Sequence, residues 1–482
     1  PPGPRERFSE IPMHAQPTPA PDMRRFTLIW LGQLVSVIGS GLTSFALGVW
    51  IYSETGNVTP FALTALFATL PTVLVSPLAG ALVDRWNRRL VLIVSDTGAA
   101  LSTLVAALLL LSGQLEIWHI YLVVLVISLC GAFQEPAYTA SITLLVSKKD
   151  LGRASGMVQS AQALSMLISP LLAGLLFSVI GAGGVMLVDF ASFFFAIGAL
   201  LLVAIPQPPA EPSHEAEKPS LWRETTYGWH YIRARSGLFG MLIYFALINF
   251  LINISGILIP PLILSFSTAE VLGLVQSASG VAMLAGGIVM SAWGGPKRRM
   301  RGIYAFAAIS SLGLIVSGLE PSAFVVGAGF SILLFTVPIA SGSSQAIWQS
   351  KVAPAVQGRV FATRSMISRS IMPLAFLLAG PLADRVFEPM MSAEGTLASA
   401  SLLGVNVGEF IGFGPGRGIG LMFILSGLLL LAATTAAYLH PRIRNVEDEL
   451  PDAVPSEEDS DGLPERVSET NLTSEGAMAP SA

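Results

Sequence analysis

The sequence predicts an all-α membrane protein with twelve transmembrane helices, arranged as two parallel-repeat bundles of six. Composition gives the first indication, because 52% of the 482 residues are hydrophobic and only 12% are charged. Soluble domains carry about 25% charged residues. The second indication is a series of apolar runs long enough for helices of roughly 20 residues to cross a bilayer. The third is an internal repeat that relates the first half of the chain to the second.

The apolar runs are expected to be helices rather than barrel strands. Lipid offers backbone groups no hydrogen-bond partners, and the runs are far longer than strands that cross a bilayer. The first bundle is expected to contain the spans 26–52, 60–83, 90–112, 117–146, 154–180 and 183–205. The second is expected to contain the spans 237–264, 269–292, 302–319, 321–350, 357–386 and 417–440.

Basic residues set the expected orientation, because Lys and Arg gather on the cytoplasmic side near membrane spans. With the amino terminus inside, all but Arg369, Arg385 and Arg417 of the 27 basic residues fall in the termini or inner loops. The outer loops carry acids such as Glu54 and Glu116. We therefore expect a multi-pass protein of the cell (inner) membrane with both termini in the cytoplasm.

Three segments lie outside the two bundles, which are expected at 23–205 and 237–440. Residues 1–22 are rich in proline and are expected to form a flexible cytoplasmic arm. Residues 441–482 are rich in acids and are expected to be a disordered cytoplasmic tail. The linker 206–236 places four residues at helical spacing: Trp222, Thr225, Trp229 and Ile232. This spacing predicts an amphipathic helix at the inner interface. A basic linker with scattered aromatic residues is the alternative.

The internal repeat is visible without any gap. Residues 144–174 align with residues 350–380 at an offset of 206, so that Gly174 falls on Gly380. An even number of spans separates the two copies, so both copies share one orientation. That is the plan of a transporter built from two parallel halves that rock against each other.

Motifs of several other protein classes are absent from the sequence. Cys130 is the single cysteine and the five His residues have no metal-ligand spacing, so we expect neither a disulfide framework nor a metal site. There is no Walker-type phosphate-binding motif. We expect no cofactor, no enzymatic activity and no nucleic-acid partner. The expected partners of this monomer are a small-molecule substrate, protons and the lipid bilayer.

The segment “GALVDRWNRRL”, residues 80–90, resembles the loop motif G-x-L-a-D-r-x-G-r-r of the major facilitator superfamily. Further similarity lies in the first, fourth and sixth spans, and it points to the branch that contains macrolide and enterobactin exporters. The resemblance extends from about residue 26 to residue 440. In the family this motif forms a cytoplasmic latch between the halves, which implies a gating role for Gly80, Asp84, Arg85, Arg88 and Arg89. For the three arginines, a role in setting topology alone is the alternative.

The sequence departs from the family pattern at several positions. Asn87 stands where the motif has Gly, and the second copy has Met290 where the first has Asp84. The fourth span lacks the arginine of many proton-coupled drug antiporters, and Ser169 replaces the first Gly of the antiporter motif in the fifth span. These departures leave the coupling mechanism open.

Polar residues on the spans that, by the resemblance, surround the central cavity are candidates for the substrate or proton pathway. They are Gln33, Gln134, Glu135, Tyr138, Gln162, Asn249, Asn253, Gln345 and Arg369. Asn249 and Asn253 are four residues apart and therefore share one helix face. For each amide or hydroxyl, a hydrogen bond between helices is the alternative. Asp189, near the outer end of its span, is interpreted as a structural cap.

Glu135 and Arg369 are the charged candidates deep inside their spans. At ~1.5 Å per residue both lie roughly 17 Å from the inner ends of their helices, so their heights match. Two mechanisms follow: Glu135 carries protons, or it pairs with Arg369 as a substrate-sensitive gate. A permanently hydrogen-bonded structural acid is the third reading.

Together, these features predict a secondary active transporter that exports a small amphipathic molecule, such as a drug, siderophore or secondary metabolite. It is expected to work by alternating access, as a proton-coupled antiporter. Three alternatives stay open: an importer or uniporter of the same fold, a non-transporting membrane receptor, and the membrane module of a larger biosynthetic polypeptide. The last is raised by the missing initiator Met.

Overall fold

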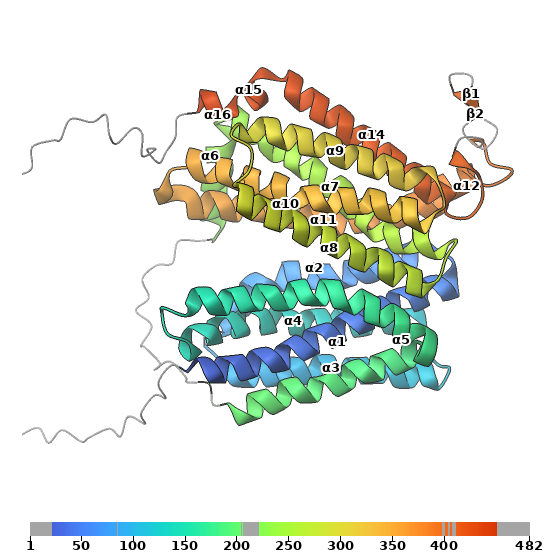
Figure 1. The fold of residues 1–482 in the computed structure, drawn as a ribbon. Helices are drawn as coiled ribbons and strands as arrows, with labels where there is room; N and C mark the ends of the chain where they lie inside the picture. Colours follow the sequence, from blue (N-terminus) through green and yellow to red (C-terminus); the bar gives the residue numbers. More distant parts are fainter. Residues whose placement is uncertain are drawn as a thin grey trace, which may run out of the picture.

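The protein is built from long helices that run side by side (Figure 1). The computed structural model describes residues 22–83, 85–203, 205, 221–397, 401–402, 405–406 and 411–450. Within these residues, eleven helices are long and apolar enough to cross a membrane. The predicted all-α membrane fold is therefore confirmed.

Five helices form the first bundle, called the N-half. They are α1 (Met23–Thr55), α2 (Val58–Val83), α3 (Arg88–Leu111), α4 (Ile117–Leu145) and α5 (Leu151–Leu202). Helix α5 has 52 residues and is interrupted at Gly181, where φ is 67° and ψ is 176°. The chain doubles back in α5 (Figure 1). Among the described residues, α5 thus contains both of the spans predicted at 154–180 and 183–205, on either side of Gly181.

The second bundle, called the C-half, follows the helix α6 (Leu221–Arg233). Its long helices are α7 (Ser236–Leu264), α8 (Ala269–Trp293), α9 (Arg299–Leu319), α10 (Ala323–Lys351), α11 (Pro354–Leu382) and α14 (Arg417–Leu439). Its short elements are the π-helix η1 (Ala383–Phe387), α12 (Glu388–Met390), α15 (Pro441–Arg444) and α16 (Val446–Glu449). The two-residue strands β1 (Ser401–Leu402) and β2 (Val405–Asn406) pair antiparallel.

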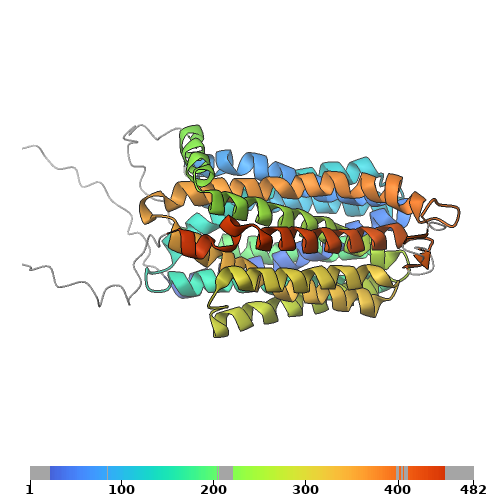
Figure 2. The ribbon, with the colours of Figure 1, turned by 90° about the horizontal axis from the view of Figure 1, so that it is seen from above.

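The same helix neighbours recur in both halves. In the N-half α1 packs on α5, and α4 packs on α2 and α3. In the C-half α7 packs on α11, and α10 packs on α8 and α9. Between the halves, α5 packs on α8 and α2 packs on α11. Figure 2 shows these helices as one elongated bundle seen at right angles to the first view.

The two halves meet near one end of the bundle. We call the end where α1 begins and α16 ends the termini side, and the opposite end the far side (Figure 1). Hydrogen bonds between described residues of the two halves run from Ser277 Oγ to the Leu167 carbonyl, and from the Val58 and Thr59 amides to Asp384. All three lie in the far-side part of the seams.

Apolar packing shows the same asymmetry. One large cluster of buried residues is continuous across both halves and includes Phe45 of the N-half and Leu258 of the C-half. A separate cluster occupies the termini side of the N-half alone, around Phe26, Leu92 and Leu145. Among the described residues, the hydrogen bonds between the halves and the apolar cluster that they share therefore lie toward the far side.

Two segments outside the bundles form helices. The linker segment in which an amphipathic helix is expected forms α6, which packs against α7 and α11: Ile232 is fully buried and the ring of Trp229 lies 5.8 Å from that of Phe239. The tail expected to be disordered from 441 begins with the helices α15 and α16. Glu447 anchors them, because its carboxylate accepts from the Met300 amide at 2.8 Å at the start of α9. The residues after 450 and the arm 1–21 lie outside the described residues.

Candidate functional site

A polar cavity of about 280 Å³ lies inside the N-half, among α1, α3, α4 and α5. Its hydroxyl groups come from Ser36, Ser40, Thr43, Ser44, Thr103 and Ser128. Two carboxylates, Asp96 and Asp189, also line it, and its described lining contains no basic residue. Ionisable groups inside membrane bundles are costly and usually functional. We call this space the N-half cavity.

The first carboxylate, Asp96 on α3, is held by two glutamines from other helices. Gln33 on α1 donates its Nε2 to Asp96 Oδ2 at 3.0 Å, and Gln134 on α4 donates its Nε2 to Asp96 Oδ1. Gln134 also lies 3.4 Å from Gln33 Oε1. Asp96 is only 5% exposed. Both partners are neutral amides, so this Asp96 cluster satisfies the carboxylate without supplying a counter-charge.

The second carboxylate, Asp189, joins three helical segments. Thr43 on α1 donates its hydroxyl to Asp189 Oδ2 at 2.7 Å, and Thr103 on α3 does so at 3.5 Å. A Cβ added at Gly39 would lie 2.6 Å from Asp189 Oδ1, so α1 approaches too closely for a side chain there. The interpretation of Asp189 as a cap is therefore wrong, because its carboxylate accepts from neighbouring helices within the bundle.

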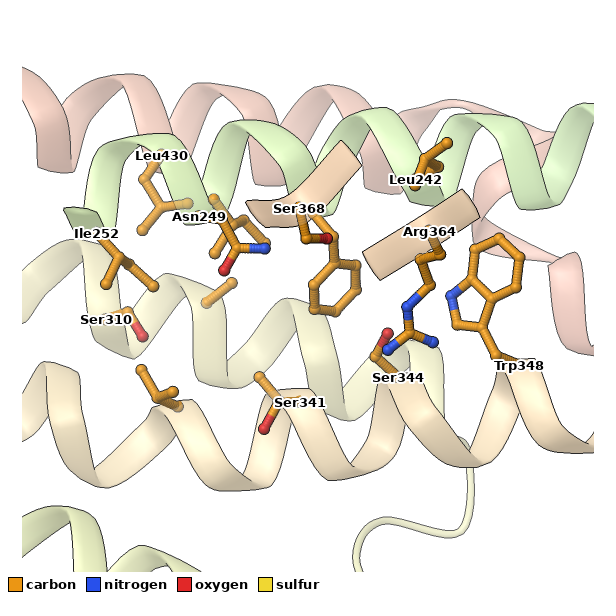
Figure 3. Close-up of a pocket in the computed structure, with 15 residues that line it drawn as sticks. Leu242, Asn249, Ile252, Ser310, Ser341, Ser344, Trp348, Arg364, Ser368 and Leu430 are labelled. Carbon is orange, nitrogen blue, oxygen red and sulfur yellow. The ribbon is translucent and has the colours of Figure 1, made fainter. Parts of the chain in front are cut away.

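A second cavity, of about 130 Å³, lies inside the C-half (Figure 3). We call it the C-half cavity. Apolar and aromatic side chains, among them Leu242, Phe245 and Trp348, make up much of its wall. Polar groups from four helices also face it: Asn249, Ser310, Ser341, Ser344, Arg364 and Ser368. An apolar wall with a few polar groups is typical of sites for amphipathic small molecules.

Arg364 carries the charge of the C-half cavity. Its Nη2 donates to Gln345 Oε1 at 2.8 Å, and its guanidinium carbon lies 5.4 Å from the centre of the Trp348 ring. Figure 3 shows the guanidinium between Ser344 and Trp348. Its Nη1 is buried and has no hydrogen-bond partner among the described residues. A buried donor without an acceptor is costly, so this nitrogen is available to an acceptor group on a ligand.

Gln162 lies in a third space, of about 320 Å³, where the two halves meet. Helices α1, α2 and α5 contribute to it from one side, and α7 and α8 contribute Pro260, Leu272 and Gln276 from the other. The aromatic rings of Phe45 and Phe61 also face this space. Gln162 therefore lies at the interface between the halves, and its role in a substrate pathway stays a prediction.

The other predicted pathway residues are more dispersed. Asn253 donates its Nδ2 to the Asn249 carbonyl of its own helix at 2.7 Å, which favours a structural role. The Tyr138 hydroxyl is buried and has no partner among the described residues. Glu135 and Arg369 are both exposed, and the described residues form no ion pair between them. Their predicted roles as carrier and gate stay predictions.

The loop motif is described only in part, because Asp84 lies outside the described residues. Arg88 donates to the Ala140 carbonyl at 2.9 Å, and Arg89 donates to the Leu200 carbonyl at 2.8 Å. Both bonds tie helix ends within the N-half. Arg85 is exposed, and a Cβ added at Gly80 would meet no atom within 4 Å. The Asn87 side chain, in place of the motif glycine, caps α3 by accepting from the Leu90 amide at 3.1 Å.

Sequence reasoning missed the acid at the centre of the N-half cavity. The signal was present, because Asp96 lies in the apolar run 90–112, as Glu135 lies in 117–146. The sequence places Arg364 near the inner end of the span 357–386, among the basic residues of the cytoplasmic side. In the structure α11 turns the guanidinium toward Gln345 and Trp348, and hydropathy does not show this rotation.

The described site residues can bind protons, cations and hydrogen-bonding groups, but they do not form a metal centre. Among the described residues, no group of three or more His, Cys, Asp or Glu side chains could hold a metal ion. A buried carboxylate held by neutral donors can bind a proton or a cation, and either would remove the cost of the buried charge.

Two repeated halves of membrane-length helices, each with an internal cavity, define a multi-pass membrane transporter. The sequence comparison agrees: residues 29–376 match the Major Facilitator Superfamily, and the chain belongs to that family. The predicted resemblance is thus confirmed. The matched proteins are transporters, so the chain is a transporter and not an enzyme.

Similar proteins include named efflux pumps. Macrolide efflux protein A of Streptococcus pyogenes is 28% identical over 366 residues, which cover 75% of this chain and 90% of that protein. Multidrug efflux pump Tap of Mycolicibacterium fortuitum is 24% identical over 372 residues, which cover 74% of this chain and 88% of that protein. The chain is thus an MFS transporter that is similar to macrolide and multidrug efflux pumps.

Among solved structures, a bacterial homologue of the human lysosomal transporter Spinster, in an inward-facing and unoccupied conformation, superimposes with a TM-score of 0.65. It is 14% identical, and the match covers 89% of this chain and 98% of that one. The nucleoside transporter NupG gives a TM-score of 0.60 at 14% identity, and the match covers 87% of this chain and 100% of that one. These likenesses establish the fold.

Proposed function

We propose that the protein exports small amphipathic molecules, including macrolide-like compounds, from the cytoplasm in exchange for protons by alternating access. The sequence similarity to macrolide and multidrug efflux pumps supports the direction and the substrate class. We further propose that the termini side faces the cytoplasm, because the basic loops lie there. Substrate would then enter between the halves from the termini side, inside the cell. A single chain suffices for this mechanism.

The Asp96 cluster is the observation that carries the proposed proton coupling. Asp96 is buried, faces a polar cavity and is held by amides from two other helices, Gln33 and Gln134. Proton binding there would neutralise the Asp96 carboxylate, and proton release would restore its charge. Glu135 is the competing carrier, but it is exposed and has no hydrogen-bond partner among the described residues. We therefore assign the coupling to Asp96.

The test uses proteoliposomes with an imposed pH gradient and radiolabelled erythromycin as the probe. Asp96→Asn keeps the shape and loses the titrating group, so we expect pH-driven accumulation to be lost, because acids inside membrane bundles form proton relays. Counterflow exchange without a gradient should persist. Glu135→Gln is the matched control and should retain pH-driven accumulation. Full accumulation by Asp96→Asn with loss in Glu135→Gln would move the coupling to Glu135.

A further inference from the structure

The far-side end of α11 has the same sequence pattern as the motif that ends α2. “GPLADR” at 380–385 and “GALVDR” at 80–85 share Gly, Leu, Asp and Arg at identical spacing. The helices α2 and α11 pack against each other across the seam between the halves. They run in opposite directions, so the two patterns lie at opposite ends of one helix pair.

The acid of the α11 pattern, Asp384, bridges the seam. Its Oδ1 accepts from the Val58 amide at 2.8 Å, and its Oδ2 accepts from the Thr59 amide at 2.7 Å. These amides belong to the first two residues of α2. Amides at a helix start have no partner within the helix, and the helix dipole is positive there. One carboxylate of the C-half therefore caps a helix of the N-half.

The backbone around Asp384 brings it close enough for both bonds. A Cβ added at Gly380 would lie 2.5 Å from the Thr59 Cα, so glycine is needed where the two helices meet. Beyond Leu382 the helix widens into the π-helix η1, which contains Asp384. Short π-helical turns occur frequently at functional sites. The local geometry thus directs the carboxylate at the start of α2.

The other seam shows that this acid is not required for packing. By the 206-residue offset, Gly174 of α5 corresponds to Gly380, and Ser178 corresponds to Asp384. Gly174 packs on the start of α8 as Gly380 packs on α2, because an added Cβ would lie 2.8 Å from the Ala269 carbonyl oxygen. Ser178 instead donates to the Leu175 carbonyl of its own helix at 2.8 Å. The charged bridge is specific to the α2·α11 seam.

We infer that Asp384 is a gating residue, a far-side latch that holds the protein closed on that side. The latch breaks when the far side opens, because the Val58 and Thr59 amides belong to the opposite half. This inference rests on the alternating access of the proposed function.

The latch is tested by distances between spin labels measured with pulsed electron resonance in detergent. Cys130→Ser removes the single native cysteine. Labels at Gln114→Cys and Glu320→Cys report the far side, since both positions are exposed loop residues of opposite halves. Labels at Lys149→Cys and Lys297→Cys report the termini side in the same way. Asp384→Ala and Asp384→Asn are each compared with the same labelled Cys130→Ser protein without a further change, called the parent. Ser178→Ala is the matched control.

We expect Asp384→Ala to lower the ratio of far-side-closed to far-side-open molecules by about tenfold, the effect of losing hydrogen bonds to a charged acceptor. The termini-side distance should shorten in the same molecules, because closing one side accompanies opening the other. Asp384→Asn keeps an acceptor oxygen and should have a smaller effect. Ser178→Ala should match the parent.

Unchanged far-side distances in both Asp384 variants would overturn the latch, and so would an equal shift in Ser178→Ala. If Asp384→Ala does not fold, as judged by gel filtration and circular dichroism, Asp384→Asn decides alone. The distance measurements test the latch independently of the proposed transport. If the far-side distance shifts in the Asp384 variants but the protein shows no proton-driven erythromycin transport, the latch stands and the proposed function is contradicted. If transport is present but the far-side distance does not shift, the proposed function stands and the latch is contradicted.

Discussion

The two internal cavities have related helix arrangements and opposite charge. The described lining of the N-half cavity contains Asp96 and Asp189 and no basic residue, whereas that of the C-half cavity contains Arg364 and no acid. Hydroxyl groups line the first, and apolar and aromatic side chains dominate the second. A duplicated scaffold therefore retains its packing while its two interiors diverge. The division suits a transporter in which one half binds the coupling ion and the other contributes more to substrate binding.

The largest expected effect comes from filling the space beside Asp189. In Gly39→Ala the added Cβ would lie 2.2 Å from Ser192 Oγ and 2.6 Å from Asp189 Oδ1. We expect a loss of about 3 kcal/mol of stability, the upper range for overpacking a buried site. Thermal unfolding in detergent measures it. Gly131→Ala is the control, because Gly131 lines the same cavity but its added Cβ would meet nothing within 4 Å. Equal stability of the two variants would contradict the tight packing around Asp189.

The charge of the C-half cavity should affect binding rather than coupling. Arg364→Ala removes the buried donor, and we expect the apparent KM for erythromycin to rise about tenfold, which corresponds to about 1.4 kcal/mol. The dependence of uptake on the pH gradient should stay as in the parent. Arg364→Lys keeps the charge but not the planar fork and should be intermediate. If KM is unchanged and the pH dependence is lost, the roles of the two cavities would have to be exchanged.

The smallest effect distinguishes the two hydroxyl donors to Asp189. Thr43→Val removes a hydrogen bond of 2.7 Å, whereas Thr103→Val removes a contact of 3.5 Å. We expect Thr43→Val to cost about 1 kcal/mol of stability and Thr103→Val to cost less, because a long hydrogen bond is weak. Thermal unfolding under identical detergent conditions compares them. A larger loss in Thr103→Val would show that the local geometry is different.

The spans could be predicted closely, since they depend on a property of the sequence itself. A bilayer demands apolar length, and caps such as Asn87 and positive-φ glycines such as Gly56 set helix ends locally. The break in α5 was also foreseen, because the spans 154–180 and 183–205 are separated close to Gly181.

The site was predictable only in part, because helix rotation is set by packing. Gln134 and Glu135 are neighbours in sequence, yet Gln134 bonds Asp96 inside the bundle while Glu135 is exposed. Consecutive residues of a helix point about 100° apart, and hydropathy does not say which one faces inward when the whole run is apolar. For the same reason Gln33 was named without its partner Asp96. Side-chain partners across helices require the three-dimensional arrangement.

The docking of α16 determines where the folded chain can be shortened. Beyond the last span, the Glu447 carboxylate caps α9, and Lys351 Nζ donates to the Leu450 carbonyl at 2.6 Å. A truncation after His440 would therefore expose the start of α9 and deprive a buried lysine of an acceptor. An expression clone that ends after Leu450 retains both contacts. A purification tag or a fluorescent fusion placed beyond that residue leaves these two contacts in place.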